Sequence, residues 1–240
     1  MRTQRKLNEI RPLSITPHVI DHAEGSVEIK LGKTHLICTA TLEPQVPKWL
    51  QNSGQGWVTA EYGMLPRSTH SRIKRERAMQ SGRTQEISRL IGRSLRAATD
   101  LTALGERQIY VDCDVIQADG GTRTAAISGG FVALALAFNF LKECGTLSNI
   151  PLKTAVAAIS VGLKGSEILL DLDYEEDSQI DTDMNIVMNA DYNFIEVQGT
   201  AESHSFSKAQ LMEMLDTAKM GCQKVFEVQN TILQPFFKVL

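Results

Sequence analysis

The sequence lacks the features of a membrane or secreted protein. Its longest run of apolar residues, Phe131–Phe138, is far shorter than the roughly 20 residues that a membrane-spanning helix needs. The first twelve residues, MRTQRKLNEIRP, are polar and charged, unlike the apolar centre of a secretory signal peptide. We therefore expect a cytoplasmic protein that does not contact a membrane.

Cysteine is scarce and unclustered. The four cysteines, Cys38, Cys113, Cys144 and Cys222, are far apart, with no CxxC pair and no nearby histidine to complete a zinc site. This spacing argues against a disulfide scaffold or a zinc ribbon. Cys38 and Cys113 lie in strand-like runs, so we expect them to be small buried hydrophobic residues in a reducing compartment.

An overall excess of positive charge is also absent, since 25 basic residues face 28 acidic ones and the net charge is −3. The basic residues are nevertheless concentrated. Nine of them lie between Arg67 and Arg96, where the only acids are Glu76 and Glu86. Such a local excess is typical of a surface that binds phosphate or nucleic acid. A solvated helix face followed by a loop would account for it equally well.

Hydrophobic periodicity predicts an α+β protein. We expect a hairpin at 24–43 around Gly32-Lys33, and strands at 54–62, 107–119, 156–163, 168–173, 185–189 and 194–199. Helices are expected at 84–100, 122–141 and 207–229, the last capped by Ser207, and a long exposed loop at 66–81. Strands followed by a helix, twice, predict a single domain over 1–240 with two similar halves, roughly 1–145 and 151–240.

The stretch QADGGTRTAAISGG, residues 117–130, joins a strand to an apolar helix. Gly120-Gly121 lets a ligand approach the backbone, the start of a helix presents unpaired N–H groups, and Arg123 adds donors that match phosphate oxygens. The alternative is that Thr122 only caps the helix and Arg123 pairs with an acid. Neither GxGxxG nor GxxxxGK[ST] is matched, so the segment is an anion site in principle without a nucleotide-loop motif.

A second glycine–arginine pair stands at the start of the helix expected at 84–100, in Ser81-Gly82-Arg83-Thr84. One such pair is weak evidence. Two arginines at helix starts within the same half of the chain strengthen the hypothesis of a bound phosphate.

A dense acidic run, DLDYEEDSQIDTD, covers residues 171–183. Crowded carboxylates are costly unless they are solvated, share protons or hold a metal, and Mg²⁺ is typically held by one or two carboxylates plus substrate phosphate. Asp177 and Asp183 are the sharper candidates, because Asp183 opens a predicted strand. An acidic surface turn is the alternative.

Several motifs together resemble the ribonuclease PH family of phosphate-dependent 3′-to-5′ exoribonucleases. They are HAEGSVEI, GWVTAEYGMLPRST, SGRTQEISRLIGRSLRA, LGERQIYVDCDVIQADGGTRTA, LLDLDYEED, DTDMNIVM and FIEVQGTAE. The chain departs from the family near its start, where Thr3-Gln4-Arg5-Lys6 replaces a DGR-type segment. We expect that segment to lie apart from the chemistry.

The resemblance implies the α+β fold of the second domain of ribosomal protein S5, assembled as a homohexamer, a trimer of dimers. It implies trimming of transfer-RNA precursors, with ribosomal RNA as a second candidate substrate, by phosphate as co-substrate with release of nucleoside diphosphates. The reverse reaction adds nucleotides, which makes the enzyme a tRNA nucleotidyltransferase. The site residues that it implies are Arg83, Gly121, Thr122 and Arg123 for phosphate, Asp177 and Asp183 as catalytic carboxylates and possible Mg²⁺ ligands with Asp181 nearby, and Arg67, Arg72 and Arg75 for transfer RNA.

Two alternative functions remain open. One is a catalytically inactive, RNA-binding ring subunit of the same fold, which would be expected to lack the arginines or aspartates that this chain retains. The other is a metal-dependent hydrolytic nuclease. Two arginine sites argue against hydrolysis, because a water nucleophile needs no anion cradle.

Overall fold

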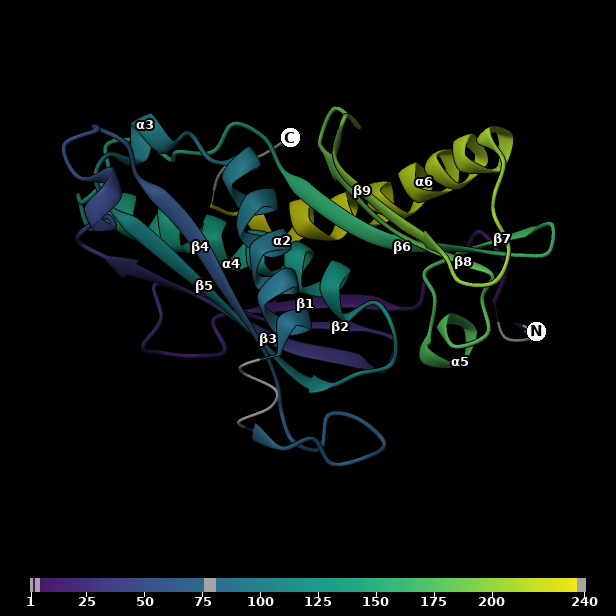
Figure 1. The fold of residues 1–240 in the computed structure, drawn as a ribbon. Coiled ribbons are helices and arrows are strands. Elements are labelled where there is room, and N and C mark those ends of the chain that lie inside the picture. Colours follow the sequence, from purple (N-terminus) through teal and green to yellow (C-terminus); the bar gives the residue numbers. More distant parts are fainter. Residues whose placement is uncertain (1, 3–4, 76–80, 237–240) are drawn as a thin grey trace.

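The computed structural model describes residue 2 and residues 5–75 and 81–236, which form two sheets with helices packed on them (Figure 1). The first sheet has the order β1-β2-β3-β5-β4, from β1 (Leu13–Pro17), β2 (Gly25–Leu31), β3 (Thr34–Glu43), β4 (Trp57–Met64) and β5 (Gln108–Gln117). The second has the order β7-β6-β8-β9, from β6 (Val156–Lys164), β7 (Glu167–Leu170), β8 (Thr182–Asn189) and β9 (Phe194–Ala201). All neighbours are antiparallel except β4 and β5.

The first sheet confirms the predicted hairpin. Strands β2 and β3 pair from Gly25–Ala40 to Leu31–Thr34, and Gly32, with φ of 59°, makes the tight turn between them. Strand β5 lies on the other side of β3, where Cys113 stands opposite Cys38. Both cysteines are buried, as predicted.

Helix α4 (Thr122–Glu143) is the centre of the core. It contacts β2, β3 and β5 of the first sheet and β6 of the second. A Cβ on Gly129 would lie 2.8 Å from Cγ2 of Ile29, so glycine is what lets the helix approach the sheet. In the described part of the chain, α4 alone has the length and apolar character of a membrane span, and 94% of that apolar stretch is buried inside the protein.

The other two long helices cover one sheet each. Helix α2 (Gly82–Ala98) packs on β4 and buries the predicted apolar stripe, which includes Ile87, Leu90 and Leu95. Helix α6 (Lys208–Leu233) packs on β6 and begins at the predicted cap, Ser207, whose hydroxyl accepts from the N–H of Gln210 at 3.2 Å. Two similar strand-and-helix halves make up the α+β fold, which confirms the predicted fold class.

Short elements depart from the prediction. Strand β1 was not expected, because it is a five-residue edge strand that ends in proline. The strand expected to reach residue 173 stops at Leu170, since Asp171 has φ of 57° and leaves the ladder. The acidic run after it contains a short helix, α5 (Tyr174–Asp177). Within the described residues, the remaining short helices are η1 (Lys48–Leu50) and α3 (Leu101–Leu104).

Candidate active site

The start of α4 is an open anion-binding terminus. Gly120 and Gly121 both have positive φ, at 75° and 69°, and Gly121 is the N-cap residue with no side chain to cap the helix. The first N–H groups of the helix therefore lack an internal partner, at the positive end of its dipole. A Cβ on Gly120 would meet the carbonyl oxygen of Leu172 at 2.5 Å, so this turn needs glycine for its conformation and for its packing.

The alternative role of Thr122 as a helix cap is wrong. Thr122 is the first helical residue, and its Oγ1 accepts a hydrogen bond from the hydroxyl of Tyr62 at 2.9 Å. This bond leaves the hydroxyl hydrogen of Thr122 available to an anion. The hydroxyl that bonds the N-cap residue is that of Thr124, which donates to the carbonyl oxygen of Gly121 at 2.9 Å.

The alternative pairing of Arg123 with an acid is also absent from the described residues. One nitrogen of Arg123 donates to Oε1 of Gln198 at 3.4 Å, and Gln198 in turn donates to Glu86 at 2.7 Å. A neutral amide holds the side chain without neutralising it. Arg123 therefore keeps its charge and most of its donors for a ligand.

Arg83 lies near Arg123, although the two are 40 positions apart in the chain. It is exposed on the first turn of α2, and no hydrogen bond or ion pair joins it to another described residue. Burial raises the pKa of Tyr62, while the charges of both arginines lower it, and both charges also lower the pKa of Asp177. The two predicted arginine sites therefore converge on one place.

The two predicted carboxylates meet at the same place. Asp177 is the last residue of α5 and open to solvent at the edge of the site, and Asp183 is the second residue of β8. Neighbouring protein atoms displace part of the water around each carboxyl, which raises the pKa of both, and the charges of Asp177 and Glu202 raise that of Asp183 further. Negative charge is thus concentrated beside the positive charge of the arginines.

Glu202 is a site residue that the sequence analysis did not single out. Its charge raises the pKa of both Asp177 and Asp183, so it lies close to them. Glu202 is the last residue of the motif FIEVQGTAE. The resemblance of that motif to the family is the only feature of the sequence that could have drawn attention to this residue. Asp181 has a different role, because it accepts from the N–H of Gly165 at 2.7 Å and from Ser203 at 2.8 Å, and these bonds lower its pKa.

The fit of Mg²⁺ to the site depends on Asp177 and Asp183. Among residues 5–75 and 81–236, no group of three or more His, Cys, Asp or Glu side chains is arranged as a metal site. Two carboxylates are nevertheless the usual protein contribution to Mg²⁺, which takes further ligands from substrate phosphate and water. The pKa values of Asp177 and Asp183 are raised, which means that the protein alone disfavours their charged forms. A bound cation would stabilise those charged forms.

The basic segment divides between structural and exposed residues. Arg67, Arg72 and Arg75 are exposed on the loop that projects from the molecule after β4 (Figure 1). Arg77 lies outside the described residues. On α2, two arginines bind other parts of the protein: Arg93 forms an ion pair with Glu196, and Cζ of Arg96 lies 4.3 Å from the ring centre of Trp57.

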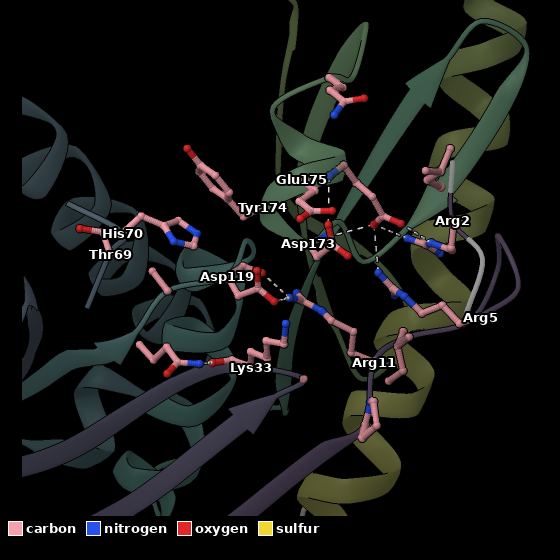
Figure 2. A pocket seen from close by; sticks show the side chains of 18 of the residues that line it. Arg2, Arg5, Arg11, Lys33, Thr69, His70, Asp119, Asp173, Tyr174 and Glu175 are labelled. Carbon is pink, nitrogen blue, oxygen red and sulfur yellow. Dashed lines mark hydrogen bonds and ion pairs between the residues drawn. The ribbon is translucent and has the colours of Figure 1, made fainter. Parts of the chain in front are cut away.

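A large cavity lies beside this site rather than in it. It has a volume of about 1100 Å³, and Figure 2 shows the side chains that line it. Arg67 and His70 come from the basic loop, and Asp173 and Tyr174 from the acidic run, but none of Arg83, Arg123, Asp177 and Asp183 lines it. Arg67 thus lines this cavity, whereas Arg72 and Arg75 do not.

The sequence matches models of a known protein family in both halves of the chain. Residues 9–138 match domain 1 and residues 154–221 match domain 2 of the 3′ exoribonuclease family. A protein of Bdellovibrio bacteriovorus named ribonuclease PH is 55% identical over 235 residues, covering 98% of this chain and 97% of its own length.

Solved structures of other proteins share the fold of this chain. Rice Rrp46 is 21% identical with a TM-score of 0.78, over 96% of this chain and 99% of its own. A chain of the Archaeoglobus fulgidus exosome, solved with RNA bound to the active site, is 23% identical with a TM-score of 0.77, over 93% of this chain and 90% of its own. At these identities the likeness describes the fold alone.

Proposed function

Because the chain belongs to the 3′ exoribonuclease family, we propose that it is a phosphate-dependent 3′-to-5′ exoribonuclease acting at the site just described. The observation that carries the proposal is the convergence of two arginines and an uncapped helix start on a pair of carboxylates. Such a site offers a cradle for an anionic nucleophile beside groups that handle the leaving oxygen.

Inorganic phosphate is the nucleophile. One of its oxygens attacks the phosphorus of the last phosphodiester, the bond to the 3′ oxygen of the preceding nucleotide breaks, and that oxygen takes up a proton. The products are a nucleoside diphosphate and an RNA shortened by one nucleotide. The reverse reaction extends the RNA. Phosphoryl transfer depends mainly on positioning and charge neutralisation, so fixed donors suffice for much of the catalysis.

Four residues hold the phosphate. Arg83 and Arg123 supply charge and forked donors, and the N–H groups at Gly121 and Thr122 supply the positive end of α4. The Thr122 hydroxyl, fixed by Tyr62, adds one more donor. These donors orient the attacking oxygen and cost no reorganisation when the reaction occurs.

Asp177 and Asp183 are the catalytic carboxylates. They would hold Mg²⁺, which when bound neutralises negative charge on oxygens of the reacting phosphoryl group. Their raised pKa values also suit a carboxyl that gives a proton to the leaving 3′ oxygen. A requirement of the activity for divalent metal would indicate the first role, and a dependence of the rate on the protonation of a carboxyl would indicate the second.

The RNA substrates are 3′ ends of transfer-RNA precursors, held upstream by Arg67, Arg72 and Arg75. Their exposure and charge suit contacts to the phosphate backbone, which position RNA without reading its sequence. Phe, Trp and Tyr are absent from residues 67–77, so the contact is electrostatic rather than stacking. The working form is a homohexameric ring in the cytoplasm, where four free cysteines stay reduced.

One assay tests the function. The protein is incubated with a 3′-extended transfer RNA, with and without inorganic phosphate, and the mononucleotides are identified. Phosphorolysis predicts nucleoside diphosphates only when phosphate is present. Nucleoside monophosphates without phosphate would indicate hydrolysis, and a protein that binds the RNA without products in either condition would be an inactive ring subunit.

A further inference from the structure

Arg11 is a buried cation that joins the two halves of the chain next to the candidate site. Only 6% of its surface is exposed. In the second half, its Nε and Nη2 donate to the two carboxylate oxygens of Asp171, at 3.0 and 2.7 Å, and Nη2 also donates to the carbonyl oxygen of Leu172 at 3.2 Å. In the first half, Nη1 donates to the carbonyl oxygen of Asp119, and Nη2 to that of Gly120 at 3.3 Å.

The first-half partners of Arg11 belong to the glycine turn that opens α4. Asp119 and Gly120 directly precede the N-cap residue Gly121, and a Cβ on Gly121 would lie 3.1 Å from Nη2 of Arg11. The guanidinium therefore packs against the residue that presents the helix start to phosphate. Figure 2 shows the Arg11 side chain reaching Asp119 from the segment that precedes β1.

The second-half partners open the acidic run. Asp171 is fully buried and has φ of 57°, an uncommon conformation that its bonds to Arg11 and Arg5 hold in place. Two residues later Asp173 caps α5, in a capping box with Glu176, and α5 ends at Asp177. The bonds of Arg11 to Asp171 and Leu172 therefore help to fix the loop that leads into α5, and with it the position of Asp177.

We infer that Arg11 is a positioning residue that holds the phosphate-binding turn at Gly120–Thr122 at a set distance from the helix that carries Asp177. This rests on the proposed function, since it takes that turn to be the phosphate site. Arg11 would act through these two loops. Its planar fork spreads five donors over both loops, whereas the ammonium of lysine is a compact charge with three donors. Small misplacements of reacting groups are costly in rate, so the link matters for catalysis.

Arg5 provides a matched control. It bonds the same acidic loop, through Asp171 and Glu176, at 3.2 and 3.0 Å. Unlike Arg11, it has no bond to Asp119 or Gly120 among the described residues. Replacing Arg5 therefore loosens the acidic loop without cutting the link to the phosphate turn.

The test compares Arg11→Met, Arg11→Lys and Arg5→Met in the full chain, by the KM for phosphate, the KM for a short RNA, kcat and thermal unfolding. Arg11→Met is expected to raise the KM for phosphate about tenfold while the KM for RNA changes less than about twofold. Arg11→Lys, which keeps the charge and favours folding, is expected to raise the KM for phosphate by a smaller factor. Arg5→Met is expected to leave that KM within about twofold.

Two results would overturn the inference in distinguishable ways. If Arg123→Ala raises the KM for phosphate but both Arg11 variants leave it unchanged, or change both KM values equally, Arg11 has only a structural role. If Arg123→Ala also leaves the KM for phosphate unchanged, the phosphate site is misplaced, and the proposed function of the turn fails together with the role of Arg11.

Discussion

The hydroxyl of Tyr62 on β4 donates a hydrogen bond to Oγ1 of Thr122, at 2.9 Å, where α4 begins. This bond ties the edge of the first sheet to the proposed phosphate site and turns the Thr122 hydroxyl toward an anion. Tyr62 is itself buried and stands close to the charges of Arg83 and Arg123.

Tyr62→Phe removes that bond and little else. Loss of one hydrogen bond of ordinary strength predicts a rise of about two- to tenfold in the KM for phosphate, with a smaller change in the KM for RNA. Steady-state kinetics at varied phosphate measure this. Tyr110→Phe, on the neighbouring strand β5, is the matched control and should behave as the original protein. Equal effects of the two variants would remove Tyr62 from the phosphate site.

Asp183→Asn is expected to stabilise the protein while it inactivates it. The pKa of the Asp183 carboxyl is raised in the folded state, so folding is disfavoured once this carboxyl is charged, and that cost is present above the raised pKa. At pH 7 the variant should therefore melt at a temperature higher by about 1–3 °C, with activity reduced on the order of 100-fold. The gain should vanish as the pH falls below the ordinary pKa of aspartate.

Asp181→Asn is the control for that experiment. The N–H of Gly165 and the hydroxyl of Ser203 lower the pKa of Asp181, so its stabilising contribution is present at neutral pH and lost as the pH falls through the lowered pKa. This variant should melt at a lower temperature at pH 7 and keep its activity. A fall in melting temperature for Asp183→Asn would contradict the electrostatic account of the site.

Removal of divalent metal tests the role of the carboxylates. Chelation is expected to abolish activity and added Mg²⁺ to restore it. Binding of Mn²⁺, followed by electron paramagnetic resonance, should weaken at least about tenfold in the Asp177→Asn, Asp183→Asn double variant and stay unchanged in Asp181→Asn. Equal Mn²⁺ binding by all three proteins would leave proton transfer as the role of Asp177 and Asp183.

The exposed arginines of the basic loop are expected to matter only for long substrates. Arg72→Ala with Arg75→Ala should weaken binding of a transfer-RNA precursor and reduce the slope of log K against log salt by about 1.4, while a short oligonucleotide is processed as before. Lys142→Ala is the control, because this exposed lysine lies at the far end of α4 from the phosphate site. Equal losses on both RNAs would contradict an upstream contact.

The sequence predicted the long elements and the type of site, because these depend on local patterns. The apolar stripe of α2, the hairpin around Gly32 and the glycine turn before Thr122 are all present. The resemblance to the ribonuclease PH family is confirmed by a relative that is 55% identical over nearly the whole chain. The roles of Arg83, Arg123, Asp177 and Asp183 stay predictions, although the structure brings these residues together.

Other features depend on contacts between distant segments of the chain, so they could not be predicted from the sequence. The N-terminal segment was expected to lie apart from the chemistry, and Thr3 and Gln4 fall outside the described residues. Arg5, however, pairs with Asp171 and Glu176, beside the acidic helix. No periodicity marks such pairs across the chain, nor the bridge made by Arg11, nor the approach of Glu202 to Asp183.

In the proposed reaction phosphate, not water, attacks the RNA. The most direct measurement uses inorganic phosphate labelled with ¹⁸O in all four oxygens, a 3′-extended transfer RNA, and mass spectrometry of the released mononucleotides. If phosphate attacks, the products are nucleoside diphosphates in which the β-phosphate, including the oxygen that bridges to the α-phosphorus, carries four labelled oxygens. Unlabelled nucleoside monophosphates, formed at the same rate without phosphate, would contradict the proposed reaction.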